Sequence, residues 1–215
     1  MATMLVFIFT NAFLPLPTLS KALRQSVDKS FHMLTIDGDT STNDMVTLTS
    51  ISADSTRPKY DMKVENNLIR GLEYVCTKLA RVIAKGAEGA TTLITVEVKG
   101  AYSLEDAKKA ARTIANSTLL KAAVHGRDPN WGRIVAALGY SGAKTKSESL
   151  SIAIADVWVV KNGESQSFDY EELRMKMNTD ELKITVDLGM GRHSAIAWGC
   201  DLSEEYVRIN SEFST

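Results

Sequence analysis

The sequence predicts an α/β protein built from layered sheets and helices. Segments whose apolar residues recur every three to four positions, as in amphipathic helices, alternate along the chain with short β-branched segments that are typical of strands. The 215 residues contain no internal repeat, no low-complexity tract and no long linker. A single unit is therefore expected over 1–215.

The N-terminal part is expected to hold two strands and two helices. The apolar run 4–9 and the segment 45–51 predict the strands. Ser20 is the expected N-cap of the first helix, whose apolar residues are four apart: Leu23, Val27 and Phe31. A longer helix is predicted over 64–85, before Gly86, from an apolar stripe with steps of three and four: Leu68, Leu72, Val75, Leu79 and Val82.

The remainder of the chain is expected to supply most of the sheet. Strands are predicted over 91–98, 134–138, 150–160, 182–188 and 194–198. The last two are separated by GMGR (189–192), which indicates a hairpin turn. Ser103 and Asp106 resemble a capping box that opens a helix, and shorter helices are expected over 169–177 and 203–209.

Composition and charge exclude several classes of function. The chain is 44% hydrophobic and carries 25 Lys plus Arg against 26 Asp plus Glu, so neither nucleic acid nor an anionic membrane is an expected partner. No stretch approaches the roughly 18 apolar residues of a membrane span. Cys76 and Cys200 lack metal-binding spacing and are expected as free thiols in the cytoplasm. The histidines are scattered singly, which makes a zinc site unexpected.

Thr3 stands directly before the apolar run, where a threonine could serve as a nucleophile. If the chain were cleaved between Ala2 and Thr3, one residue would carry both a hydroxyl and a free α-amine, and an amine with a pKa near ~8 can act as the base. The alternative for this segment is a secretory signal peptide. No basic residue precedes Lys21, and Thr10 interrupts the apolar run, so the pattern does not favour export.

Two polar loops are candidates for binding. DGDTSTND (37–44) is rich in oxygen ligands, but a calcium-binding EF-hand would need Gly and Glu where Thr42 and Leu48 stand. A loop whose side chains bond its own backbone is expected instead. Glu88 lies between two glycines in KGAEGAT (85–91), where it could meet a cationic ammonium; on this pattern alone a solvated turn is favoured.

A third polar segment, HGRDPNWGR (125–133), combines turn-forming residues with two arginines. Arg127 or Arg133 could bind a carboxylate, because a guanidinium pairs with both carboxylate oxygens. A structural turn tied down by an arginine is an equally good interpretation. His125 has no nucleophile beside it in the sequence and is assigned no role.

Eight segments taken together resemble one family, the ornithine acetyltransferases of arginine biosynthesis, also called glutamate N-acetyltransferases. They follow the family's order and span nearly the whole chain: MATML (1–5), DGDTSTND (37–44), AEGAT (87–91), TVEVKGA (95–101), ARTIANS (111–117), DPNWGR (128–133), AWGCDL (197–202) and YVRINSEFST (206–215). The resemblance implies a layered α/β fold of the N-terminal-nucleophile-like type.

The resemblance also implies a precursor that cleaves itself at an Ala–Thr bond into an α-chain and a β-chain. This sequence is similar to the β-chain, with Met1 and Ala2 matching the end of the α-segment and Thr3 matching the nucleophile. An α-chain partner is implied, in a heterotetramer of two α and two β chains. The family's oxyanion donors and a binding lysine lie in that α-chain, so this chain alone is expected to be inactive.

Three further residues match substrate-binding positions of the family. Glu88 in AEGAT matches the binding glutamate, and this match replaces the interpretation as a solvated turn. Asn210 and Thr215 match the binding asparagine and the terminal threonine, with the family's spacing retained.

The implied reaction is acetyl transfer from N-acetylornithine to glutamate through an acetyl ester on Thr3, by a ping-pong mechanism. The resemblance implies no metal and no bound cofactor, and leaves acetyl-CoA open as a second acetyl donor. Two other functions stay open. One is a related amidohydrolase or aminopeptidase, in which water replaces glutamate as the acceptor; the other is a non-catalytic fragment that only binds amino acids.

Overall fold

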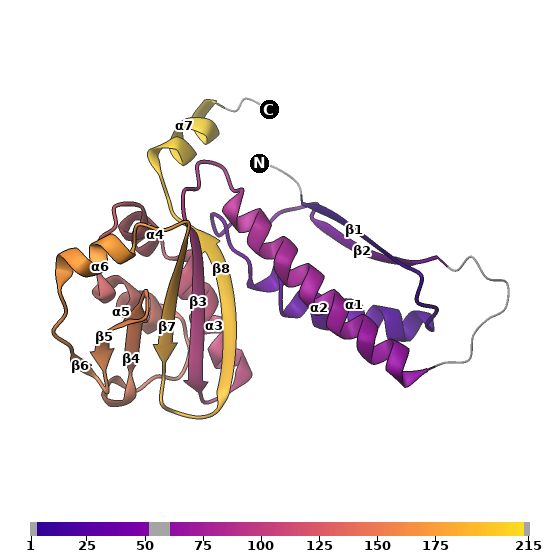
Figure 1. Cartoon of the computed structure of the whole chain (residues 1–215), viewed down its shortest axis with the longest axis horizontal. Helices are drawn as coiled ribbons and strands as arrows, with labels where there is room; N and C mark the ends of the chain where they lie inside the picture. The colour runs from indigo at the N-terminus through magenta and orange to yellow at the C-terminus, as the bar shows by residue number, and fades with distance from the viewer. Residues whose placement is uncertain (1–3, 52–60, 213–215) are drawn as a thin grey trace. The chain divides into compact units, whose positions relative to one another are not determined.

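The computed structural model describes residues 4–51 and 61–212 (Figure 1). Two compact units make up the chain. The first comprises Met1–His32 with Asp39–Ala80, and the second comprises Met33–Gly38 with Arg81–Thr215.

The first unit contains a two-stranded parallel sheet. Strand β1 (Leu5–Thr10) pairs with β2 (Met45–Ser50) residue for residue, and helix α1 (Leu16–Asp28) lies in the connection between them and packs against β2. Helix α2 (Met62–Lys85) begins in this unit. Its residue Cys76 is buried and hydrogen-bonded to Ser30, just after the end of α1.

One face of β1 is apolar and open to solvent. Leu5, Phe7 and Phe9 alternate along the strand and are 55%, 57% and 65% exposed, whereas the intervening Val6 and Ile8 are half-buried. Parallel sheets are normally covered on both faces, and two strands alone are rarely stable. Among the described residues, nothing covers this outer face of β1 (Leu5, Phe7 and Phe9).

The second unit is built on a six-stranded mixed sheet, in the order β6-β5-β4-β7-β3-β8. Only β3 and β7 pair in parallel; the other neighbours are antiparallel. The strands are β3 (Leu93–Ala101), β4 (Ser151–Ile154), β5 (Val157–Lys161), β6 (Glu164–Ser165), β7 (Glu181–Asp187) and β8 (His193–Cys200).

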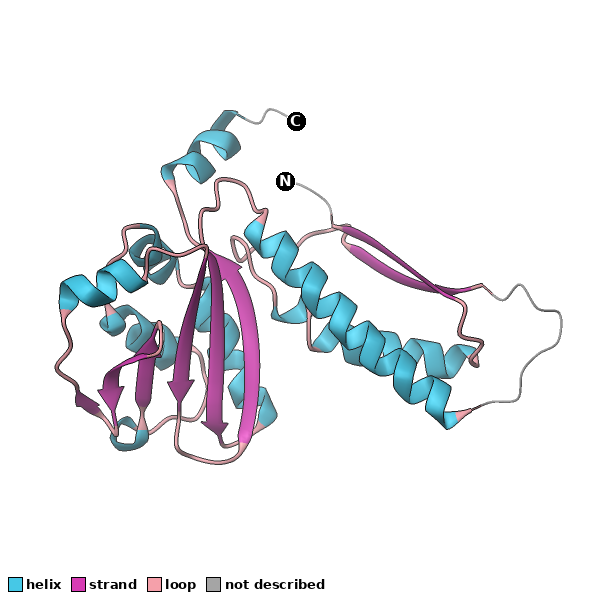
Figure 2. Cartoon of the chain, viewed as in Figure 1, coloured by secondary structure: helices cyan, strands magenta, loops and turns pink. Residues whose placement is uncertain are grey.

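Helices lie on one face of this sheet and bury its apolar side. Ile94, Val96 and Val98 of β3 and Ile184 of β7 are fully buried. Helix α3 (Leu104–Asn116) packs against β3 and β8, and with α4 and α5 it lies behind the central strands in Figure 2. The remaining helices of this unit are α4 (Thr118–His125), α5 (Trp131–Tyr140), α6 (Tyr170–Lys176) and α7 (Glu204–Glu212), with a 3-10 turn at Ser147–Ser149. A second 3-10 turn, Phe31–Met33, lies where the chain passes from the first unit into the second.

The core of the second unit should be sensitive to truncation. We expect Ile184→Ala to lower the free energy of unfolding by about 2–5 kcal/mol, because the lost contacts leave a cavity in the sheet. Ile196→Ala, on the 39% exposed Ile196 of β8, is the control and should cost less than about 1 kcal/mol. Urea unfolding of the chain measures both, and equal losses would contradict the assignment of the core.

Several expected elements are confirmed. The Ser103 hydroxyl accepts from the Asp106 amide and caps α3, and the strand predicted over 91–98 is found as β3. The loop over 37–44 does bond to itself, since the Ser41 hydroxyl accepts from the Asn43 amide.

Two absences are noted for residues 4–51 and 61–212 alone. No His, Cys, Asp and Glu side chains there are grouped so that they could hold a metal ion, and none of the helices formed by these residues could span a bilayer.

The strand predicted over 134–138 is wrong, because these residues lie in helix α5. The buried residues Ile134, Ala137 and Leu138 are spaced three and four apart, on one helical face. A short apolar run fits a buried strand and a buried helix equally well, so the spacing of its apolar residues does not distinguish a strand from a helix.

The single strand predicted over 150–160 is two strands, β4 and β5, joined by a tight turn. Ala155 and Asp156 both have positive φ, 48° and 61°, as the favoured two-residue hairpin turns require. An Ala-Asp pair carries none of the usual Asn-Gly or Asp-Gly signal. The turn was therefore not visible in the sequence.

The hairpin predicted between 182–188 and 194–198 is also wrong. Both segments are strands, β7 and β8, but β3 lies between them in the sheet. The connection passes over the end of β3, where the Met190 amide donates to the Gly100 carbonyl. Glycines between two strands indicate a turn, but they do not say which strands pair.

The start of α1 and the buried face of α2 differ from those predicted. Helix α1 begins at Leu16 after Pro15, with Pro17 in its first turn, so Ser20 is an interior residue and not the N-cap. Helix α2 buries Leu72, Cys76 and Ala80, four apart, while the predicted stripe residues Val75 and Val82 are exposed. The small side chains of Cys76 and Ala80 allow close packing, which hydrophobicity alone does not reveal.

Candidate active site

The structure brings together two of the residues predicted to bind substrate. Asn210, in the second turn of α7, donates from its side-chain nitrogen to Glu88 Oε2 at 2.9 Å. The same amide nitrogen also donates to the Tyr206 carbonyl at 2.9 Å, which fixes its orientation. Glu88 lies in the turn between α2 and β3, so residues 122 positions apart in the chain meet at one point.

The other predicted site residues lie outside the described part of the chain. These are the nucleophile Thr3, the cleavage-site residue Ala2, Met1 before it, and Thr215. Their roles stay predictions.

The turn that carries Glu88 packs tightly on the start of α7. Gly89 has φ +67°, and a Cβ atom there would lie 2.5 Å from the Tyr206 nitrogen and 2.8 Å from the Ser203 hydroxyl. The Ser203 hydroxyl donates to the Gly89 carbonyl at 2.6 Å and accepts from the Tyr206 amide at 3.3 Å. Only glycine fits at position 89, for reasons of both backbone conformation and space.

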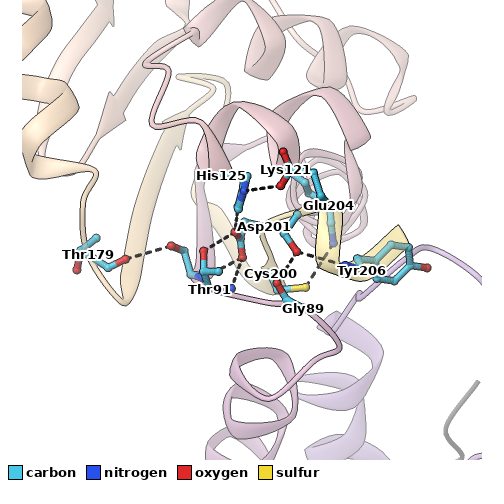
Figure 3. Close-up of polar contacts among 11 residues, drawn as sticks. Gly89, Thr91, Lys121, His125, Thr179, Cys200, Asp201, Glu204 and Tyr206 are labelled. Carbon is cyan, nitrogen blue, oxygen red and sulfur yellow. Dashed lines mark hydrogen bonds and ion pairs between the residues drawn. The ribbon is translucent and has the colours of Figure 1, made fainter. Parts of the chain in front are cut away.

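A buried carboxylate lies beside this turn. Asp201, whose side chain is 0% exposed, accepts through Oδ1 from the Thr91 and Thr92 amides at 2.7 and 2.9 Å. Its Oδ2 accepts from the Thr91 hydroxyl at 2.6 Å and lies 2.8 Å from Nδ1 of His125 (Figure 3). Because an ionised carboxylate can only accept, the His125 Nδ1–H is the donor. His125 Nε2 in turn lies 3.3 Å from the Glu204 carboxylate.

These contacts keep Asp201 ionised. Burial by itself would raise its pKa, but hydrogen bonds from Thr91, His125 and Thr92 outweigh burial and hold the pKa of this carboxyl below its usual range. Since the carboxyl pKa is lower in the folded state than in the unfolded state, the resulting stability is present above the unfolded pKa of about 3.9. It is lost as the pH falls through the folded pKa.

We expect Asp201→Asn to destabilise the chain by about 1–3 kcal/mol at pH 7, because an amide cannot accept from all four donors. The difference from the unmodified chain should shrink as the pH is lowered below about 5, because protonation of the Asp201 carboxyl in the unfolded state progressively removes the stability that the ionised carboxylate gives the folded chain. Urea unfolding across this pH range tests the expectation. Asp180→Asn is the control, because the Asp180 side chain is 84% exposed; a constant difference for Asp201→Asn would contradict the prediction.

A second buried charged group lies next to Asp201. The Lys121 ammonium donates to the Ile36 carbonyl and lies 3.7 Å from the Cys200 sulfur. Burial raises the pKa of the Cys200 thiol despite the nearby Lys121 charge, so the thiol is held in its unreactive protonated form. Both cysteines are free and buried, as the sequence predicts.

The two arginines of the segment 125–133 have different surroundings. Arg133 Nη1, on α5, donates to the Leu119 carbonyl of α4 at 2.6 Å and so links the two helices on either side of the turn. Arg127 is exposed, has φ 54° and lines a polar pocket of about 400 Å³. The pocket lining is Thr91, Thr92, Val124, His125, Arg127, Asn178, Thr179 and Asp180. The interpretation as a structural arginine therefore holds for Arg133. Arg127 instead lines the pocket, and binding of a carboxylate there stays a prediction.

Sequence reasoning missed Asp201, Ser203 and the part played by His125. Each makes its contacts with residues far along the chain: Thr91 for Asp201, Gly89 for Ser203 and Asp201 for His125. The only signal was the segment AWGCDL (197–202), which entered the resemblance as a block with no role for its aspartate.

The chain is similar in sequence to proteins that are named for acetyl transfer to glutamate or for arginine biosynthesis. The chain is 48% identical over 220 residues to a protein named glutamate N-acetyltransferase from Methanosarcina mazei, and 44% identical over 217 residues to an arginine biosynthesis bifunctional protein ArgJ from Bacillus cereus. These matches cover 100% of this chain but 55% and 53% of the relatives, so the chain spans about half the length of the curated relatives it matches.

The fold is shared with a solved structure. The crystal structure of arginine biosynthesis bifunctional protein argJ from Bacillus halodurans superposes with a TM-score of 0.89 at 39% sequence identity, over 98% of this chain and 100% of that chain. The α/β class expected from the sequence is thus confirmed. The sequence pattern of the ArgJ family matches residues 1–215 from end to end, and the chain belongs to the ArgJ family.

Proposed function

We propose that this chain is the nucleophile-bearing part of an acetyltransferase that moves the acetyl group of N-acetylornithine to glutamate. The observation that carries the proposal is the contact between Glu88 and Asn210. These residues match two of the family's substrate-binding positions and are 122 residues apart, yet they meet in the fold. The names of the relatives, glutamate N-acetyltransferase and arginine biosynthesis bifunctional protein, support the same reaction.

The chemistry follows from a threonine with a free amine. The Thr3 hydroxyl attacks the acetyl carbonyl carbon while the Thr3 amine takes the hydroxyl proton and passes it to the departing nitrogen of ornithine. The carbon–nitrogen bond breaks and an acetyl ester on Thr3 remains. The amine of glutamate then attacks this ester, N-acetylglutamate leaves, and the proton returns to the threonine oxygen.

Glu88 supplies the charge that this substrate needs. N-acetylornithine carries a side-chain ammonium, and a carboxylate held in the turn after α2 offsets it. The Asn210 amide, itself oriented by the Tyr206 carbonyl, holds one oxygen of Glu88 and leaves the other oxygen for the ammonium. Thr215 completes this set in the proposal, as the resemblance implies.

The proposal includes a partner. The relatives are nearly twice as long as this chain, and in the proposal their additional part is the α-chain of a precursor cleaved between Ala2 and Thr3. The outer face of β1 supports this, because an apolar face on a two-stranded parallel sheet gains stability when another segment covers it. We place two chains of each kind in the active assembly, in the cytoplasm, where free buried thiols persist.

The test is an assay of the chain combined with the part of the Methanosarcina mazei relative that it does not cover. With N-acetylornithine and glutamate supplied together, N-acetylglutamate and ornithine are the expected products. Acetate formed equally well without glutamate would instead indicate an amidohydrolase. Binding of N-acetylornithine with no turnover would indicate a non-catalytic binding protein.

A further inference from the structure

We propose that Asp201 is a positioning residue for Glu88: it holds the turn that carries Glu88 in place against the start of α7, the helix that carries Asn210. This inference rests on the proposed function, because it takes Glu88 and Asn210 as groups that bind the substrate. Asp201 itself is fully buried and is not proposed to touch the substrate.

The Asp201 carboxylate clamps the chain only three residues after Glu88. It binds the amides of Thr91 and Thr92 through one oxygen and the Thr91 hydroxyl through the other, at 2.6–2.9 Å. The backbone completes the connection, because the Asp201 amide donates to the Thr92 carbonyl at 3.1 Å. The segment that follows Glu88 therefore cannot shift unless Asp201 shifts with it.

The same carboxylate is linked to the start of α7. Asp201 precedes that helix by three residues, and its histidine partner reaches forward to Glu204 in the first turn, with 3.3 Å between His125 Nε2 and Glu204 Oε2. Figure 3 shows Asp201 between Thr91 on one side and His125 on the other. The Ser203 hydroxyl adds a direct bond from this segment to the Gly89 carbonyl.

The hydrogen bond from Asn210 to Glu88, whose geometry Asp201 maintains in this proposal, tolerates little movement. Asn210 Nδ2 and Glu88 Oε2 are 2.9 Å apart. A displacement of about 0.6 Å would stretch this distance beyond the range of a hydrogen bond. Small displacements of binding groups are expensive: a misplacement of about 1 Å can cost as much as ~100-fold in rate. A residue that never meets the substrate can therefore control how well Glu88 binds it.

The experiment compares three variants in the chain assembled with the complementary part of an ArgJ relative. Asp201→Asn removes the buried charge, and Thr91→Val removes only the hydroxyl donor. Asp187→Asn is the matched control, because the Asp187 carboxylate also accepts from a backbone amide, that of Gly189 at 2.9 Å. Asp187 lies at the last residue of β7, whereas Thr91 and Thr92 lie beside the first residue of that strand. The kcat and KM for N-acetylornithine are measured at saturating glutamate.

We expect Asp201→Asn to raise KM about tenfold or more, with kcat per active site changing less than about threefold. Thr91→Val should raise KM by a smaller factor, and Asp187→Asn should leave KM unchanged. A merely structural loss lowers the fraction of folded enzyme, and with it the apparent kcat, but leaves KM alone. If Asp201→Asn does not fold, Thr91→Val decides, and a KM within about twofold of the unmodified enzyme overturns the proposal.

A double-mutant cycle with Glu88→Gln separates this inference from the proposed function. Glu88→Gln alone should raise KM, and an unchanged KM would show that the proposed binding role of Glu88 is wrong. If Glu88→Gln raises KM, adding Asp201→Asn or Thr91→Val to it should raise KM little further, because both act through one group. Effects that multiply would show that Asp201 acts independently of Glu88 and would overturn the positioning role.

Discussion

Replacement of Thr3 by alanine is expected to lower kcat for acetyl transfer by at least about 10⁴-fold, because the substitution removes the atom that accepts the acetyl group. The chain, assembled with the complementary part of an ArgJ relative, is incubated with N-acetylornithine in the absence of glutamate. Mass spectrometry should then find an increase of about 42 Da on the unmodified chain, the mass of an acetyl group in place of hydrogen, and no increase on Thr3→Ala.

Thr3→Ser is the matched control, because serine keeps both the hydroxyl and the α-amine. It should form the same adduct and retain activity within about 100-fold of the unmodified chain. The adduct should be found only on chains that begin at residue 3, which N-terminal sequencing of the same sample checks. Undiminished turnover by Thr3→Ala, or an adduct on chains that still carry Ala2, would refute the nucleophile assignment.

Phe7→Asp is expected to weaken the binding of the chain to its partner. Phe7 is 57% exposed in the middle of the outer face of β1, and a charge placed there would be buried without a counter-ion when another segment covers the sheet. Aromatic residues at the centre of an interface commonly contribute about 2–4 kcal/mol, which corresponds to a loss of roughly 30- to 1,000-fold in affinity. Titration of the labelled chain with the complementary ArgJ part measures the affinity.

Met175→Asp is the control for the assembly experiment. Met175 is 69% exposed on α6, in the second unit, so a charge there is well solvated and should leave the affinity unchanged. Circular dichroism of the isolated Phe7→Asp chain should match that of the unmodified chain, since no described residue covers Phe7. Equal affinities for the two variants would show that the outer face of β1 is not the partner surface.

Local patterns predicted those elements whose stability is decided locally. The capping serine of α3, the existence of β3 and the length of α2 follow from residues that are neighbours in the sequence. Helix α5 was misassigned because Ile134, Ala137 and Leu138 lie in an apolar run too short to show its period. Helix α4, with Ser117 as its N-cap, was not anticipated.

The same local patterns do not predict which strands pair, or which side chains meet, when these are far apart in the sequence. The position of β3 between β7 and β8, and the turn at Ala155 and Asp156, depend on the sheet as a whole. In the candidate site, Glu88 and Asn210 were found through the family resemblance, whereas their own surroundings favoured a solvated turn. Asp201 was missed because its four donors come from residues 76 to 110 positions away, which no spacing rule connects.

Helix α7 has none of its residues buried among the described part of the chain. It is therefore anchored by polar contacts, such as Ser203 with Gly89 and Asn210 with Glu88, which contribute less than an apolar interface would. Such a helix undocks at low energetic cost, and its amides should exchange with solvent before those of β3. A ligand that binds Glu88 and Asn210 together would hold α7 in its docked position. The amides of α7 should therefore exchange more slowly as more of the protein has ligand bound.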